Sequence, residues 1–98
     1  MIYHVTTAAE WKAAQEKGQY EAASLPVEGF IHASADERQV RGVLERYFAG
    51  QTDLVKLSID PDKLEHELKW EVATSVSEEF PHIYGPLNLD AVVKVEAV

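Results

Sequence analysis

The sequence predicts an α+β fold, with a mostly antiparallel, split sheet and two main helices in a single compact domain. Short stretches that alternate apolar and polar residues predict strands, whereas only two segments combine a helical cap with helical periodicity. The predicted order is strand, helix, strand, helix and then three strands, which lacks the regular strand–helix alternation of a parallel sheet. The 98 residues, 46% of them hydrophobic, can bury the core of one domain spanning residues 1–98.

The first strand is expected at Met1–Val5, where β-branched and aromatic residues alternate with polar ones. Thr7 then begins a capping box, because Glu10 follows it at the position that returns the hydrogen bond. The first helix is therefore predicted from Ala8 to about Lys17, with Gly18 supplying a left-handed end.

The segment Gln19–Glu28 is predicted to be an ordered loop, because Pro26 discourages regular structure. Gly29–Ala33 is expected to form the second strand. Ser34 opens a second capping box with Glu37, so the strand should turn directly into a helix capped by Ser34.

The second helix has the clearest amphipathic pattern in the chain. Its apolar residues recur at helical spacing and predict one buried face that ends near Gly50. These residues are Val40, Val43, Leu44, Tyr47 and Phe48.

Three more strands are predicted, at Asp53–Ile59, Leu68–Ala73 and Ala91–Val98. Strand aromatics usually pack inside, so Trp70 is expected in the core. Phe80–Pro86 is expected to be a rigid aromatic segment, because prolines bound it.

Composition excludes several classes of function. The chain has no cysteine, which excludes disulfides, thiolate zinc sites and cysteine nucleophiles. A net charge of −8 disfavours nucleic acid as a partner. The chain opens on a strand-like segment and carries no apolar run long enough to cross a bilayer, so a soluble cytoplasmic protein without a membrane partner is expected.

Three of the four histidines lie in apolar segments, namely His4, His32 and His82. His66 lies between glutamates and is expected to be solvated. An unpaired buried imidazole is costly, so each of the three must find a partner. Either each is a satisfied core histidine, or the three share a cleft.

Other chemistries have weaker support. The spacings of 28 and 50 residues between the three histidines match no zinc-ligand pattern, so no metal is predicted. Ser24 and Ser34 lie outside any nucleophile elbow, and no glycine-rich phosphate loop occurs. Glu71 and Asp90 are candidate acids, although the favoured interpretation of Asp90 is a turn residue that follows Pro86 and Asn88.

Five linked motifs make the chain resemble the DUF952 family, small bacterial proteins of unknown function, over nearly its whole length. They are Ile2–Thr6, Gly29–Ser34, Arg46–Gln51, Leu68–Glu71 and Phe80–Pro86. The resemblance implies the ADP-ribosylation fold of ADP-ribosyltransferases and the RNA 2′-phosphotransferase, and with it a cleft shaped for NAD.

Within that resemblance, Tyr3–Thr6 is similar to the strand whose histidine and hydroxyl hold NAD, and Gly29–Ser34 to the strand that runs into a serine-capped helix. Val5 replaces a glycine of the first motif. Ile31 stands where the nicotinamide-stacking tyrosine would be, and Asp90 lies near the place of the catalytic glutamate.

The first functional hypothesis is an enzyme that acts on a nucleotide-like or ADP-ribose-like small molecule, with His4 and His32 as catalytic residues. A non-catalytic ligand-binding domain and a protein-interaction domain are the alternatives. No cofactor is predicted other than an NAD-like ligand, and the oligomeric state is not predicted. The expected ligand-binding residues are Thr6, Tyr20, Ser24, Ile31, Ser34, His82, Tyr84 and Asp90, with Tyr20 and Ser24 as a flap over the site.

Overall fold

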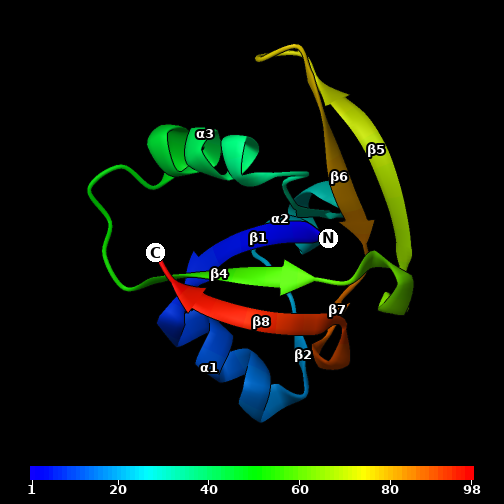
Figure 1. Ribbon diagram of the computed structural model, residues 1–98. Helices are drawn as coiled ribbons and strands as arrows, with labels where there is room; N and C mark the ends of the chain where they lie inside the picture. Colours follow the sequence, from blue (N-terminus) through cyan, green and yellow to red (C-terminus); the bar gives the residue numbers. More distant parts are fainter.

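A three-stranded antiparallel sheet contains both ends of the chain in the computed structural model, which describes residues 1–98 (Figure 1). Its central strand β4 (Leu54–Ile59) pairs with β1 (Ile2–Thr7) on one side and with β8 (Val92–Ala97) on the other. The alternation seen in the sequence places Leu57 and Ile59 on a fully buried face.

A second antiparallel sheet has the order β3-β6-β5. It consists of β3 (Ile31–His32), β6 (Glu78–Tyr84) and β5 (Glu67–Ala73). The two sheets meet at one bridge, in which Tyr3 and Ser34 exchange backbone hydrogen bonds of 2.8 and 2.6 Å. A short pair, β2 (Gln19–Tyr20) with β7 (Leu87–Asn88), completes the strands.

The two main helices lie on opposite sides of the first sheet (Figure 1). Helix α1 (Ala8–Lys17) begins as predicted, with the Thr7 hydroxyl accepting from the Glu10 N–H, and ends at Gly18 with a φ of 98°. Helix α3 (Glu37–Tyr47) covers the other side. The prediction of an α+β domain with antiparallel sheets and two main helices is confirmed.

The core consists of two clusters. Under α1, Ala14 packs with the buried faces of both sheets, including Ile31, Leu57 and Ile83. Under α3, a smaller cluster forms from Val5, Val40 and Leu54. Burial of these apolar faces on either side of the first sheet provides the main driving force for the fold.

The prediction of a loop at residues 19–28 is wrong at both ends. It contains strand β2, and a short helix, α2 (Ser24–Glu28), follows. Pro26 is tolerated because it lies in the first turn, where a backbone N–H has no partner within the helix in any case. The second strand is correspondingly shorter than predicted, with only Ile31–His32 in β3.

The prediction of Ser34 as a helix cap is also wrong. The backbone of Ser34 is extended and pairs with Tyr3 of β1, which leaves the helix to start later. Asp36 is the actual cap, with Oδ1 accepting from the Gln39 N–H at 2.8 Å. A capping box is a local signal, and here a long-range backbone pairing overrides it. The helix also ends at Tyr47, before the predicted Gly50.

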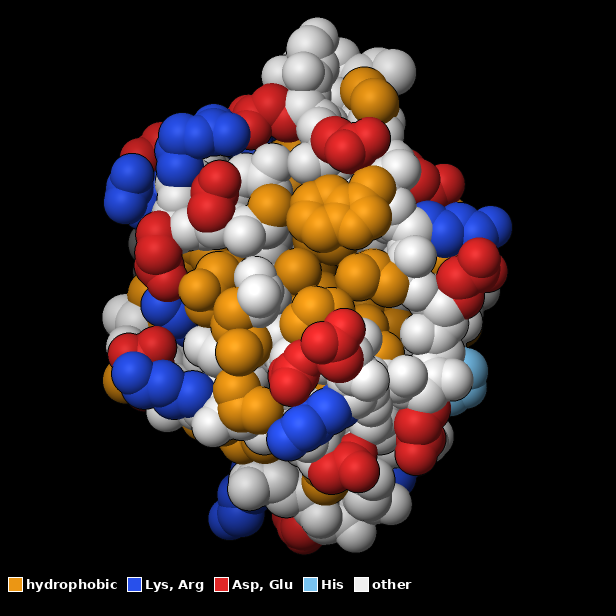
Figure 2. All heavy atoms as spheres, turned by 45° about the vertical axis from the view of Figure 1, so that its right-hand side comes forward, with side chains coloured by type: hydrophobic (Ala, Val, Ile, Leu, Met, Phe, Trp, Pro, Cys, Tyr) orange, Lys and Arg blue, Asp and Glu red, His pale blue; other side chains and the backbone are white.

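The segment Phe80–Pro86 is a strand over most of its length rather than an isolated rigid loop, because its residues up to Tyr84 belong to β6 and pair with β5. The core position predicted for Trp70 is wrong. Trp70 is 48% exposed, although it lies within strand β5. Figure 2 shows hydrophobic side chains gathered on this side of the molecule, with acidic side chains among them.

Two single 3-10 turns, Pro61–Lys63 and Leu89–Ala91, connect the remaining strands. Asp60 caps the first of these turns by accepting from the Asp62 N–H at 3.0 Å. None of the helices combines the length and the apolar character that crossing a bilayer requires.

Candidate functional site

A cleft of about 700 Å³ opens between α3, strand β1 and the β5–β6 hairpin. Most of its lining is apolar, with aromatic side chains on several walls, and its polar groups are few. Aromatic residues come from the first strand, the residue before β3, the end of α3 and strand β6. They are Tyr3, Phe30, Tyr47, Phe48 and Phe80.

The three histidines predicted from the sequence all line this cleft. His4 comes from β1, His32 from β3 and His82 from β6. His32 and His82 are directly opposite each other in the β3–β6 register, so antiparallel pairing puts their side chains on one face. Their ring centroids are 5.2 Å apart.

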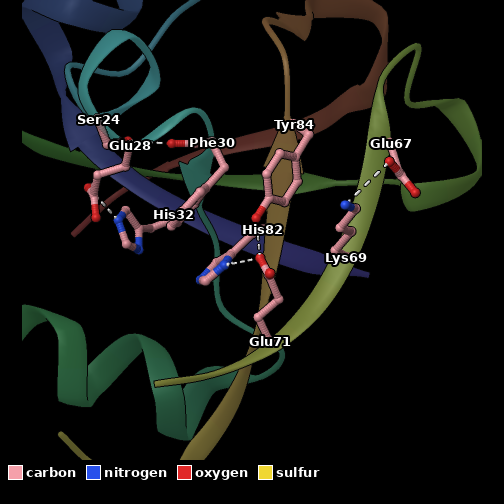
Figure 3. Close-up of polar contacts among 9 residues, drawn as sticks. All are labelled: Ser24, Glu28, Phe30, His32, Glu67, Lys69, Glu71, His82 and Tyr84. Atoms are coloured by element: carbon pink, nitrogen blue, oxygen red, sulfur yellow. Dashed lines mark hydrogen bonds and ion pairs between the residues drawn. The ribbon is translucent and has the colours of Figure 1, made fainter. Parts of the chain in front are cut away.

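His82 is nine-tenths buried and has a carboxylate partner (Figure 3). Its Nδ1 lies 2.8 Å from Oε1 of Glu71 on β5, and the hydroxyl of Tyr84 donates to the same oxygen. These two hydrogen bonds, with Tyr84 first, hold the pKa of Glu71 below its usual value. The same contact raises the pKa of the Tyr84 hydroxyl.

Phe30 fixes the plane of the His82 ring. The two rings are stacked, with centroids 4.0 Å apart and planes 16° apart. Phe30 also contacts His32, whose ring meets it edge-on at 4.8 Å. Stacking and the Glu71 hydrogen bond together restrict both the tilt and the rotation of the His82 imidazole.

His32 has its own carboxylate, but in a wetter setting. Its Nε2 lies 2.9 Å from Oε2 of Glu28, at the end of α2, and both side chains are about half exposed. The Ser24 hydroxyl donates to the Phe30 carbonyl at 2.8 Å and so ties α2 to the strand that follows (Figure 3). Ser24 was predicted to form part of a flap over the site. It does not line the cleft, and its hydroxyl instead connects α2 to Phe30.

His4 is paired through both ring nitrogens. Its Nδ1 donates to the backbone carbonyl of His32, and its Nε2 lies 2.8 Å from the Tyr20 hydroxyl. Burial lowers the pKa of His4 to about 4, so the ring is neutral at neutral pH.

The Tyr20 hydroxyl also lies 3.1 Å from Oγ1 of Thr6, whose own hydroxyl donates to Glu10 at 3.2 Å. Burial raises the pKa of Tyr20 to about 12. Thr6 and Tyr20 are themselves buried, at 2% and 3% exposure. They therefore hold His4 through hydrogen bonds inside the protein and do not line the cleft.

The remaining predicted residues are distributed differently. Ser34 lines the cleft, whereas Tyr84 does not line it and donates its hydroxyl proton to Glu71. Ile31 is fully buried in the core and does not line the cleft. Asp90 is exposed in the second 3-10 turn, where it accepts from the Asn88 amide at 2.6 Å, in agreement with its interpretation as a turn residue. His66 is exposed, as expected.

Sequence reasoning missed Phe30 and Glu28 and identified Glu71 only as a candidate acid. Phe30 and Glu71 belong to the motifs Gly29–Ser34 and Leu68–Glu71, which offered a signal for both. No motif identifies Glu28 as a partner of His32. Its position at the end of α2 could not be used, because that helix was not predicted. No group of three or more His, Cys, Asp or Glu side chains converges in the way that a metal site requires.

Residues 5–95 match the family model described as a protein of unknown function, DUF952. The chain belongs to the DUF952 family. It is similar to the crystal structure of CC0527 from Caulobacter crescentus, a structural genomics target, with 36% identity and a TM-score of 0.87 over 98% of this chain and 83% of that one. The solution NMR structure of CC0527 gives 36% identity and a TM-score of 0.83 over 99% and 83% of the two chains. No curated protein matches this chain.

Proposed function

We propose that the cleft binds a nucleotide-like or ADP-ribose-like small molecule and that His32 acts on it as an acid–base residue. The observation that carries this proposal is the convergence of three histidines, from three strands, on one mostly apolar cleft of about 700 Å³. A pocket of this size with a few converging polar groups is typical of small-ligand sites.

The walls suit the two chemical parts of such a ligand. Phe30, Phe48 and Tyr3 offer apolar and aromatic surface for a planar base or nicotinamide. Arg46, at the end of α3, also lines the cleft; it forms no ion pair and lies 5.7 Å from the Tyr47 ring centroid. An arginine that forms no ion pair can receive a phosphate. The proposed ADP-ribosylation-like fold agrees with this choice of ligand.

The roles of the histidines differ in this proposal. Glu28 is an acceptor only, so the Nε2 of His32 donates to it and Nδ1 is left for a ligand. His4 has no free nitrogen, so it acts by holding the backbone of His32 in place. Thr6 and Tyr20 would contribute through His4.

Binding can be tested by thermal shift and calorimetry with AMP, ADP-ribose and NAD. We expect at least one of them to stabilise the wild type, and His32→Ala to weaken that binding. His66→Ala is the matched control, because His66 is exposed and outside the cleft lining. If none of the three ligands binds, or if His32→Ala binds as tightly as wild type, the proposal is wrong.

A non-catalytic ligand-binding role is the second candidate, and the position of Asp90 favours it. Asp90 is bonded to Asn88 and does not line the cleft, so it cannot serve as the acid of an ADP-ribosyl transfer there. Long incubation of the protein with NAD, followed by mass spectrometry, separates the two roles. Intact NAD supports binding alone, whereas nicotinamide release supports catalysis.

A further inference from the structure

We propose that Glu71 and Tyr84 hold His82 as a second acid–base residue of the cleft, with Nε2 as the atom that meets the ligand. This inference deepens the proposed function and rests on it for the presence of a ligand. It assigns a reacting atom to His82 and positioning roles to two residues of the β5–β6 hairpin.

The first step is the tautomer of His82. An ionised carboxylate can only accept hydrogen bonds, and Glu71 lies 2.8 Å from Nδ1. Nδ1 must therefore carry a proton, and in the neutral ring the lone pair is left on Nε2. The Tyr84 hydroxyl donates to the same oxygen of Glu71 and so keeps that oxygen in place.

The second step is where Nε2 points. His82 is 7% exposed and lines the cleft, and its Nε2 has no partner within the protein. No fully buried side-chain nitrogen or oxygen of the molecule lacks a hydrogen bond. Nε2 must therefore be accessible to solvent, and because His82 lines the cleft, we infer that Nε2 faces the cleft.

The third step compares this arrangement with a purely structural histidine. His4 shows what such a residue looks like here, with Nδ1 bonded to a carbonyl and Nε2 to a hydroxyl. His82 has instead one nitrogen fixed, its plane set by the Phe30 stack, and one nitrogen free. This is the preorganisation that proton transfer to or from a bound ligand needs.

The protons balance simply. Nε2 of neutral His82 accepts a proton from a ligand hydroxyl or a bound water, and the ring becomes an imidazolium. Glu71 remains ionised and offsets the new positive charge through Nδ1–H. Returning the proton from Nε2 to a ligand or to water restores the starting state.

Long-range ¹H–¹⁵N NMR spectra of the histidine rings test the tautomer in the full-length protein. For neutral His82 we expect a single tautomer with Nδ1 protonated in the wild type, and loss of that single state in Glu71→Ala. Glu71→Gln is the matched variant and should retain the tautomer, because the amide oxygen can still accept. A wild-type His82 with Nε2 protonated, or an unchanged tautomer in Glu71→Ala, would overturn the proposal.

Carbethoxylation by diethyl pyrocarbonate, mapped by peptide mass spectrometry, tests access to Nε2 without any variant and without a nucleotide. The lone pair of Nε2 attacks one carbonyl carbon, and ethyl carbonate leaves. We expect His82 to react in native protein, as exposed His66 does, whereas His4 stays protected until unfolding. A protected His82 contradicts the inference. A reactive His82 in a protein that binds none of the nucleotides overturns only the proposed function.

Discussion

Both three-stranded sheets contribute histidine rings to the same cleft, and His4 of the first sheet is paired differently from His82 of the second. On the first sheet, His4 is held at both nitrogens and is neutral. On the second, His82 is held at one nitrogen by a carboxylate and stacked on Phe30. The comparison shows that burial alone does not make a histidine structural, because the partners of its two nitrogens decide what it can still do.

The largest expected effect is on the free energy of unfolding and comes from the buried face of the first sheet. Leu57 is opposite His4 in the β1–β4 register and is fully buried. Leu57→Ala should lower the free energy of unfolding by about 2–5 kcal/mol, because it leaves a cavity in the core. Urea denaturation measures this change.

Val95 provides the matched control for that measurement. It is opposite Leu57 on β8 but 42% exposed. Val95→Ala should change the free energy of unfolding by less than about 1 kcal/mol. An equal loss of unfolding free energy in the two variants would mean that the burial of Leu57 in the core does not explain its contribution.

The next effect is the pH dependence that His4 brings. Because its pKa falls from 6.5 to about 4 on folding, the unfolded chain binds the proton more readily. His4 thus contributes stability that is complete above pH 6.5 and is lost as the pH falls towards 4. The contribution is at most about 3 kcal/mol.

Urea denaturation of the wild type and of His4→Asn between pH 4 and pH 7 isolates this contribution as the difference between the two curves. Asparagine can still donate to the His32 carbonyl but does not titrate. Several carboxylates, Glu71 among them, also weaken the fold in acid and cancel in the difference. His66→Asn should follow the wild type, and parallel curves for His4→Asn would refute the assignment.

A smaller effect is expected at Tyr20. Tyr20→Phe removes the hydroxyl between His4 and Thr6, which should cost about 1–2 kcal/mol because two buried polar groups lose a partner. Thermal and urea denaturation can measure the loss. Tyr47→Phe is the control, because Tyr47 is 65% exposed and should give no measurable change.

The smallest effect concerns the second sheet. Tyr84→Phe removes the leading cause of the lowered pKa of Glu71, so that pKa should rise toward its usual value. NMR titration of the Glu71 carboxyl carbon measures the shift directly. Tyr3→Phe, which also changes an aromatic side chain near the cleft, should leave the Glu71 titration unchanged.

Elements whose signals are local could be predicted well. Helix α1 was predicted to within a residue, because Thr7 and Gly18 carry the information for its two ends. The alternation that predicts β4 and the periodicity of α3 are local in the same sense. Ser34 shows the limit, because its capping signal is present but its backbone pairs with Tyr3, which is distant in the sequence.

Positions that depend on a neighbouring strand could not be predicted. Trp70 was expected in the core, since nothing local shows which side chains of β5 other elements cover. Phe30 was missed because its stacking partner, His82, reaches it only through the β3–β6 register. Such contacts depend on which strands pair and in which register, and this is decided by the packing of the whole chain.

By itself, the sequence determined that an α+β fold would contain three histidines in apolar segments. Only the tertiary structure decided that His4, His32 and His82 line one cleft, that both ring nitrogens of His4 are bonded, and which nitrogen of His32 and of His82 remains free. The physical reason is that a buried imidazole must be paired, while the partner that pairs it comes from a segment elsewhere in the chain.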